Sequence, residues 1–260
     1  MSELFIFRGV DFELGHSDYL STKDKTGISL KLNEKAFSLS KDDFSYRIIN
    51  HWEKNDLLTN SRETGKGWRK YSIMDKVWLY IVKDMRNFGI SLEMIQLVKK
   101  SITLKSKSRV IFPLLEYYVS LALTGKPVFL IVFENGQASP VIEKEYQANR
   151  EYSSVNNHLQ INLNNLLQKV FPEIPVKSRN KEFAEPSLNE RKAIQLLRLG
   201  SVKKVSYIGR DGHKQQSSLK SALEGEAIVE LLFRRNYRQM ELQLANHNFF
   251  NFDNENLPVI

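Results

Sequence analysis

Basic side chains are interleaved with glycines between Thr59 and Tyr71. Gly65 and Gly67 can adopt the positive φ that a tight turn between two strands requires. The basic residues around them are Arg62, Lys66, Arg69 and Lys70. Cations on such a turn can neutralise phosphate groups, which is the sequence-independent part of nucleic-acid binding. The stretch therefore predicts a positively charged turn between two strands, a hairpin that contacts a phosphate backbone.

A helix is predicted directly before this hairpin. Its apolar residues recur at spacings of three and four, which is typical of a helix with one buried stripe. These residues are Phe44, Ile48, Ile49 and Trp52. The polar residues of the opposite face are Arg47, Asn50, His51 and Lys54. Helix and hairpin together predict one surface for gripping duplex DNA.

Two more helices are predicted behind this surface. Ser72 can cap a helix that ends near Gly89. The apolar positions of that helix are Val77, Trp78, Ile81, Val82 and Met85. Ser91, with Glu93 close behind it, opens a second, shorter helix. The pair would form a platform that supports the polar helix and the hairpin.

The residues from Phe44 to Lys99 resemble the MerR-type winged helix-turn-helix regulators. The shared motifs are His51-Trp52-Glu53, Asp56-Leu57-Leu58, Gly67-Trp68-Arg69-Lys70-Tyr71, Asp75 and Arg86-Asn87-Phe88-Gly89-Ile90-Ser91-Leu92-Glu93-Met94-Ile95. Asn50 stands where the family usually has arginine, and Trp68 replaces the tyrosine of the wing. The segment before Phe44 is a poor copy of the family's first helix.

The resemblance implies that the helix Ser45 to Lys54 enters the major groove of DNA. Arg47 and Asn50 would contact base edges and His51 a phosphate, while Trp68 would pin the wing to its helix. The complete set of predicted DNA-binding residues is Arg47, Asn50, His51, Arg62, Lys66, Trp68, Arg69, Lys70 and Tyr71. The resemblance also implies a homodimer on a palindrome, although Ser101 to Ser108 lacks the heptads of the usual dimerisation helix.

Composition agrees with a nucleic-acid partner. The chain has 260 residues and a formal net charge of +8. Residues 41–109 contain 15 Lys/Arg against 8 Asp/Glu, so about +7 lies around the predicted DNA surface. The chain has no cysteine and its five histidines are scattered, so we expect no metal site and no cofactor. No enzyme motif was found.

The sequence contains neither a signal peptide nor a membrane-spanning segment that we can identify, so we expect a cytoplasmic protein that does not enter a membrane. The first eight residues lack the apolar core of a signal peptide. The most apolar helix candidate, Val110 to Leu123, contains Glu116 and is too short to span a bilayer.

The predicted fold class is α+β, a winged helix-turn-helix domain followed by small helix-hairpin domains. Residues 1–40 form an N-terminal extension, in which Leu4 to Phe7 and the alternating Ile28, Leu30 and Leu32 favour strands. Residues 41–105 form the DNA-binding domain, 106–171 a helix-hairpin-helix domain, 172–186 a linker and 187–260 a duplicated domain.

The middle domain is predicted from a helix that begins near Val110 and tolerates Pro113 in its first turn. Apolar runs on both sides of Asn135-Gly136 predict a hairpin of Val128–Phe133 with Ala138–Ile142. Residues 144–153 are predicted as a loop and 158–171 as a helix. This block would serve as scaffold or dimer contact, or would hold an unidentified small-molecule effector or protein partner.

The last domain contains an internal duplication. Ile194–Val205 aligns with Val229–Met240 at an offset of 35, and each copy predicts a helix, a turn and a strand. Asp211-Gly212 and Asn246-His247 fall at equivalent hairpin turns. Matching cations lie in the two copies, Arg198, Lys203 and Lys204 against Arg234, Arg235 and Arg238. They indicate either a solvated face or a second surface for nucleic acid or a partner.

Three functions are compatible with these features. The first is a MerR-like transcription regulator that binds double-stranded DNA at a palindrome near a promoter. The second is an architectural accessory factor for excision, replication or partition of a mobile element. The third is an interaction adaptor whose winged domain has lost its affinity for DNA.

Overall fold

The computed structural model describes residues 6–39, 44–58, 69–106, 109–152, 157–174, 176 and 185–254. The helices are α1 (Val10–Thr26), α2 (Ile28–Asn33), α3 (Tyr46–Lys54), α4 (Ile73–Asn87), α5 (Leu92–Ile102), α6 (Pro113–Ala122), α7 (Glu143–Tyr152), α8 (Leu163–Val170), α9 (Leu188–Arg198) and α10 (Glu226–Phe233). The strands are β1 (Leu104–Ser106), β2 (Arg109–Ile111), β3 (Val128–Phe133), β4 (Ala138–Ile142), β5 (His158–Asn162), β6 (Val202–Ile208), β7 (Lys214–Ser218), β8 (Gln239–Leu244) and β9 (Phe249–Asp253).

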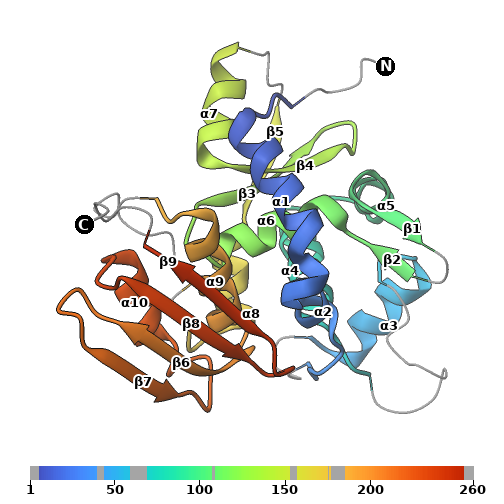
Figure 1. Cartoon of the computed structure of the whole chain (residues 1–260). Helices are drawn as coiled ribbons and strands as arrows, with labels where there is room; N and C mark the ends of the chain where they lie inside the picture. The colour runs from blue at the N-terminus through green and yellow to red at the C-terminus, as the bar shows by residue number, and fades with distance from the viewer. Residues whose placement is uncertain are drawn as a thin grey trace.

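The described strands form three antiparallel sheets. One is the hairpin β1–β2, the second has the order β4-β3-β5, and the third has the order β7-β6-β8-β9. Figure 1 shows the last sheet at one end of the molecule and α3 at another, with α6 between them. The mixed helix and sheet content agrees with the predicted α+β class.

Helix α6 is the centre of the packing. Pro113 occupies its first turn, and its side chains from Leu115 to Ala122 are buried on every side. A helix that is apolar all round is stable only inside a protein. On α9, Gln195 Nε2 donates to Ser120 O at 2.9 Å, which ties the C-terminal part of the chain to α6.

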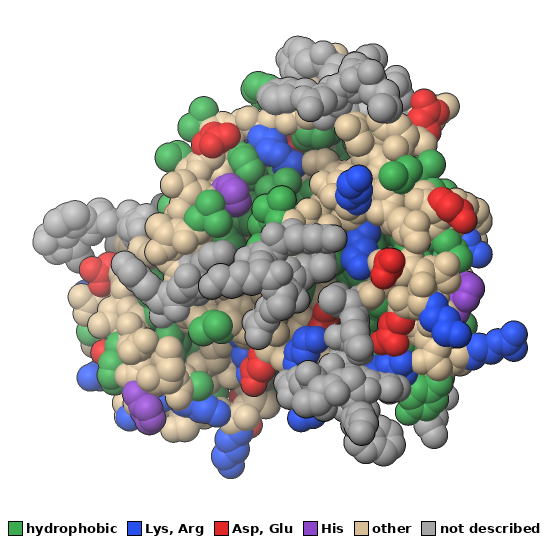
Figure 2. All heavy atoms as spheres, turned by 90° about the vertical axis from the view of Figure 1, so that its right-hand side faces the viewer, with side chains coloured by type: hydrophobic (Ala, Val, Ile, Leu, Met, Phe, Trp, Pro, Cys, Tyr) green, Lys and Arg blue, Asp and Glu red, His purple; other side chains and the backbone are tan. Residues whose placement is uncertain are grey.

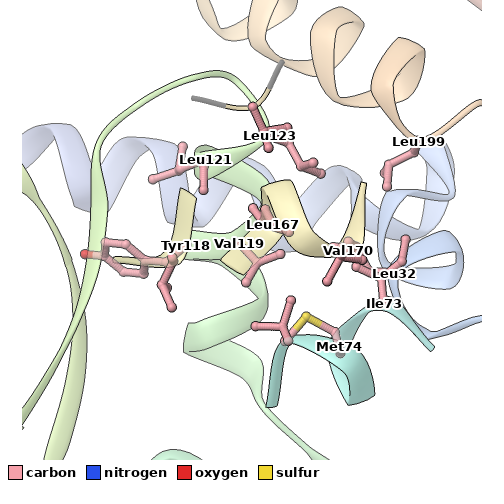
Figure 3. Packing of buried hydrophobic residues seen from close by; sticks show 14 of the residues in the cluster. Leu32, Ile73, Met74, Tyr118, Val119, Leu121, Leu123, Leu167, Val170 and Leu199 are labelled. Atoms are coloured by element: carbon pink, nitrogen blue, oxygen red, sulfur yellow. The ribbon is translucent and has the colours of Figure 1, made fainter. Parts of the chain in front are cut away.

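The core is continuous from α1 to β9. Figure 3 shows side chains from distant parts of the sequence packed together, among them Leu32 of α2, Met74 of α4, Val119 of α6 and Leu167 of α8. Burying these groups together is the main source of stability. Helices α3, α4 and α5 are therefore packed directly against the rest of the chain.

The N-terminal segment corrects the prediction of strands. Val10–Thr26 and Ile28–Asn33 are the helices α1 and α2. Ile28 and Leu32 are buried on one face of α2, whereas Leu30 is 69% exposed. Apolar residues at every second position imitate a strand, but two of them are four apart and serve a helix equally well. Residues 4 and 5 lie outside the described residues.

Helix α1 is held against α6 by polar and aromatic contacts. Tyr19 donates from its hydroxyl to Glu116 Oε1 at 2.7 Å, and its ring centroid lies 5.5 Å from that of Tyr117. Burial raises the pKa of the Tyr117 hydroxyl to about 12. The sequence alone did not indicate α1, because its polar and charged residues give it little amphipathic pattern.

The middle block confirms one element and corrects two. Strands β3 and β4 form the predicted hairpin, with Gly136 at φ +80° in the turn. Residues 144–153 were predicted as a loop, but 144–152 lie in α7, and residue 153 lies outside the described residues. The segment 158–171, predicted as one helix, begins as strand β5, and α8 starts at Leu163. The three leucines at 163, 166 and 167 belong to α8, whereas Leu159 lies in β5.

Two other predicted boundaries differ from the structure. Val110 lies in β2 rather than in a helix, and α6 begins at Pro113. Within the predicted linker, Ile174 and Val176 are buried, and Asn164 Nδ2 donates to Val176 O at 3.2 Å. Ile174 and Val176 pack on the core because removing their apolar side chains from water is favourable.

The C-terminal part consists of two segments with the same order, α9-β6-β7 and α10-β8-β9. Helices α9 and α10 cover one face of the sheet, where Val205 and Leu242 are fully buried. Residues with positive φ recur at an offset of 35, Gly200 with Arg235 and Gly212 with His247.

The hydrogen bonds of the two hairpin turns also match at this offset. His213 N donates to Asp211 Oδ1 at 3.0 Å, and Asn248 N donates to Asn246 Oδ1 at 3.2 Å. A third turn of this kind lies in the middle block, where Gln137 N donates to Asn135 Oδ1 at 2.9 Å. The unit α6-β3-β4 thus has the same helix-hairpin order and the same turn chemistry.

The β3–β4 turn contacts α5 closely enough for a direct test. A Cβ at Gly136 would lie 2.6 Å from Leu97 Cβ and 3.0 Å from Met94 Sδ. A residue with a Cβ costs roughly 1 to 2 kcal/mol in the left-handed conformation. Gly136→Ala should lower the free energy of unfolding by more than this, because the new Cβ would also clash with α5. Gly212→Ala is the matched control, because Gly212 has φ +82° and no atom within 4 Å of that Cβ. Equal losses in denaturant titrations of the two variants would contradict the contact.

Candidate nucleic-acid interface

Helix α3 presents one buried and one exposed face. Ser45 caps it by accepting a hydrogen bond from Ile48 N at 3.3 Å. Ile49 and Trp52 are buried, and the ring of Trp52 lies edge-on to Phe44 at 6.2 Å between centroids. The residues of the exposed face are Tyr46, Arg47, Ile48, Asn50, His51 and Lys54.

The carboxyl end of α3 is held by side chains from the neighbouring helices. Gln96 Nε2 on α5 donates to Asn55 O, and Lys99 Nζ donates to Asp56 O, both at 2.7 Å. Trp78 Nε1 on α4 donates to Leu57 O, also at 2.7 Å. Because these bonds satisfy carbonyls at and just after the helix end, α3 is fixed in orientation against α4 and α5.

The platform helices form as the sequence predicts. Ser72 and Asp75 make a capping box at the start of α4, and Ser91 caps α5. All five predicted apolar positions of α4 are buried. Gly89 has φ +80°, which lets the chain leave α4 and turn into α5.

Arg69 joins the end of the basic segment to α3. Its Nε lies 3.1 Å from Glu53 Oε1 and its Nη2 lies 2.7 Å from Glu53 Oε2, a bidentate pair. The same Nη2 donates to Asn50 Oδ1 at 2.5 Å. The side chains of Arg69 and Glu53 are 10% and 20% exposed. The hydrogen bond with Glu53 raises the pKa of Arg69. We call this group of Arg69, Glu53 and Asn50 the clasp.

The clasp has a measurable consequence for stability. Arg69→Ala should lower the free energy of unfolding by about 1.5 to 3 kcal/mol, the range for hydrogen bonds to charged groups. Lys31→Ala is the matched control, because the side chains of Lys31 and Glu34 are 40% and 54% exposed. Removing such an exposed pair should cost at most about 1 kcal/mol. A loss for Arg69→Ala no larger than that of the control would contradict a structural clasp.

The nine predicted site residues fall into four groups, and the structure describes three of these groups. Arg47, Asn50 and His51 share the exposed face of α3, and Lys70 is exposed. Arg69 is engaged in the clasp. Tyr71 is only 4% exposed and its backbone pairs with that of Phe37, so the prediction that it holds the DNA backbone is wrong for its ring. Arg62, Lys66 and Trp68 lie outside the described residues.

Three residues of the exposed face, Tyr46, Ile48 and Lys54, were not predicted as site residues. Ile48 was assigned to the buried stripe but is 43% exposed, and Tyr46 is 54% exposed. Ile48 and Ile49 point about 100° apart around the helix axis, and in α3 only Ile49 points into the core. Tyr46 could have been found from its spacing, because it lies four residues before the polar Asn50.

The surface around α3 is rich in charge. Figure 2 shows Lys and Arg side chains gathered in the lower half of the side of the molecule that carries α3, with Asp and Glu side chains among them. Within the described ranges, no three His, Cys, Asp or Glu residues are grouped so as to hold a metal ion. None of the helices in that part of the chain has the length and apolarity to cross a bilayer.

Comparison with known proteins agrees with this geometry. No curated protein and no solved structure matches the chain. Residues 43–102 match the model of the family described as "MerR HTH family regulatory protein". The matched range contains α3, α4 and α5 and ends at the last residue of α5. The predicted resemblance to MerR-type regulators is therefore confirmed over residues 43–102, which are similar to this family's helix-turn-helix model.

Proposed function

We propose that the chain is a sequence-specific double-stranded DNA-binding protein that regulates transcription, with α3 in the major groove. The exposed face of α3 carries this proposal. Arg47, His51 and Lys54 are exposed there, and Glu53, the acidic residue of α3, is neutralised by Arg69 in the clasp. The major groove is wide enough for an α-helix, and the phosphates beside it are negatively charged, so a rigid, cationic helix face fits there.

Base contacts follow from the donors and acceptors of this face. Arg47 can donate two hydrogen bonds to O6 and N7 of guanine. Asn50 would need both its oxygen and its nitrogen to read adenine, but Oδ1 already accepts from Arg69. Tyr46 and Ile48 offer apolar groups to thymine methyls. We therefore assign base reading chiefly to Arg47 and its two apolar neighbours, with Asn50 making at most a single contact.

Phosphate contacts are assigned to residues at the borders of α3. His51 and Lys54 face outward at its carboxyl half, and Lys70 is exposed beside the clasp. Arg62, Lys66 and Trp68 complete the proposed winged interface as predictions from the family resemblance. Such contacts fix the register of the protein on DNA, whereas the base contacts determine sequence preference.

We also propose that the protein acts as a homodimer in the cytoplasm, through a surface other than the usual dimerisation helix. Helix α5 ends at Ile102 and is followed by the hairpin β1–β2. Ser101 Oγ accepts a hydrogen bond from Ala138 N at 3.0 Å, so the end of α5 is packed on β4. A twofold dimer would require a palindromic site whose half-sites lie about one helical turn apart.

The α9-β6-β7 and α10-β8-β9 segments are proposed to be two copies of one ancestral unit. The repeated φ values and turn hydrogen bonds at an offset of 35 support this reading, in addition to the sequence alignment.

The proposal is tested by selecting ligands for the purified chain from a library of random duplexes. The expected result is enrichment of a short common sequence, protected from cleavage in a footprint. The Arg47→Ala protein, selected in parallel, should enrich a more degenerate sequence. Recovery of unrelated duplexes by the wild-type chain, with no common sequence, would contradict sequence-specific recognition.

A further inference from the structure

The cations that the duplicated segments share do not form one surface. Arg198 is buried and pairs with Glu226, and Arg234 pairs with Glu230 at 2.8 Å. Arg235 Nη2 donates to Glu185 O at 2.7 Å. Of the two predicted alternatives, a second binding surface is wrong for Arg198, because this side chain is buried and bonds across to α10 and to the end of α6. Arg234 and Arg235 are engaged by Glu230 and by Glu185 O.

A different set of cations is concentrated on the β6–β7 hairpin and its flanks. Residues 202–220 contain five Lys/Arg against one Asp, a net charge of +4. The basic residues are Lys203, Lys204, Arg210, Lys214 and Lys220. The acidic residue, Asp211, accepts the hydrogen bond that shapes the turn. We call residues 202–220 the basic hairpin.

The basic hairpin is exposed in a way that suits a large partner. In the described part of the chain β7 and β9 are the outer strands of this sheet, and all five residues of β7 are exposed. Lys203 is the extra residue where the β6–β8 register shifts, between the pairs Val202–Leu244 and Lys204–Gln243. A bulge bends a strand and redirects its side chain, so Lys203 is held outward at the edge of the basic hairpin.

The equivalent hairpin β8–β9 shows that this charge is not required by the fold. Residues 239–253 contain Glu241 and Asp253 and no Lys or Arg, a net charge of −2. The open face of the sheet is hollowed by about 320 Å³, and its lining joins Lys214 to these two acidic residues. The sheet therefore has its cations on the basic hairpin, which includes the outer strand β7, and its acidic residues on β8 and β9.

We propose that the basic hairpin is a second contact with duplex DNA, along the phosphate backbone beyond the site bound by α3. Lysines and an arginine supply charge, and the exposed Gln215, Gln216, Ser217 and Ser218 supply neutral hydrogen-bond donors. The acidic residues on β8 and β9 would be repelled by phosphates, so the β7 edge faces the DNA. Contacts to phosphates carry no sequence information, so this surface adds affinity and length to the footprint but no base preference.

This inference rests on the proposed function, and the test separates the two. The variant is Lys203→Gln/Lys214→Gln, and the matched control is Lys144→Gln/Arg150→Gln, which removes two exposed cations from α7. Binding is measured against salt on a trimmed duplex that holds only the selected site and on a duplex extended on both sides. Thermal unfolding of each protein checks that it is folded.

The expected result is a salt slope about two units smaller for the hairpin variant than for wild type on the extended duplex, since each phosphate contact contributes about 0.9. On the trimmed duplex the two proteins should have equal slopes, and the α7 control should equal wild type on both. Equal slopes for wild type and the hairpin variant on the extended duplex would overturn the proposal.

Four other outcomes also decide the question. An equal decrease for the α7 control would show a general charge effect and overturn the proposal. Salt-sensitive self-association without DNA, lost in the hairpin variant alone, would assign the surface to a second copy of the chain and overturn it as well. If Arg47→Ala keeps wild-type preference while the hairpin variant loses two units of slope, the basic hairpin stands and the role of α3 fails. Binding to neither duplex by wild type overturns both.

Discussion

Replacing Arg198 by alanine should lower the free energy of unfolding by about 3 to 5 kcal/mol, the range for breaking a buried ion pair. The Arg198 side chain is fully buried, and its Nε and Nη2 lie 2.8 and 3.0 Å from the two carboxylate oxygens of Glu226. Its Nη1 donates to Leu123 O at 2.7 Å. The alanine variant would leave the carboxylate and the carbonyl without these bonds, in an interior that water reaches poorly.

Two further variants make this result specific. Arg234→Ala removes an arginine whose side chain is 64% exposed from its pair with Glu230, and should cost at most about 1 kcal/mol. Arg198→Met/Glu226→Leu replaces both charges by apolar groups and should recover much of the loss. Chemical denaturation of the four proteins checks the series. A loss for Arg198→Ala similar to that for Arg234→Ala would contradict the role of Arg198 in joining α9, α10 and the end of α6.

Replacing Arg47 by alanine should reduce discrimination between the selected duplex and random duplexes by about 1 to 3 kcal/mol, the value of a good bidentate base contact. Arg47 lies on the exposed face of α3, and the helix below it is fixed by bonds from α4 and α5. The arginine is thus presented by a rigid element, and its loss removes a base contact together with a charge.

Lys54→Ala is the control for this experiment. Lys54 is also exposed on α3, and we assign it to a phosphate, so its loss should weaken binding to both duplexes equally. Competition titrations at two salt concentrations measure both effects. Equal weakening of specific and random binding by Arg47→Ala would remove Arg47 from base reading.

The parts of the fold that the sequence predicted well are those with strong local signals. Helices α4 and α5 carry capping serines and apolar residues at helical spacing, and the β3–β4 hairpin is marked by Asn135-Gly136. These signals act within a few residues and do not depend on the rest of the chain. The same is true of the His51-Trp52-Glu53 motif, which indicated the family whose model matches residues 43–102.

The parts that the sequence missed depend on partners far away in the chain. Helix α1 forms against Tyr117 and Glu116, about a hundred residues later, and has little apolar pattern of its own. Leu159 continues the leucine spacing of α8 but is paired with Val132 of β3. Long-range packing overrides local preference in such cases.

The sequence predicted the exposed polar face of α3 but not the contacts that individual cations make. Arg69 was predicted to contact a phosphate, whereas in the structure it donates hydrogen bonds to Glu53 and Asn50. Arg198 and Lys203 looked alike in sequence, yet one is buried and the other exposed. Charge on the surface cannot be separated from charge in the interior until the acidic partner is known.

The central claim, that α3 enters the DNA groove, can be tested by cleavage from a fixed point on the protein. The chain has no cysteine, so Lys54→Cys creates a unique attachment point for an iron chelate on α3. Lys144→Cys provides the same group on α7. We predict cleavage of the selected duplex within a few base pairs of the site centre by the chelate on α3 and none by the chelate on α7. Bound DNA that is cut from α7 but left intact by the chelate on α3 would contradict the account.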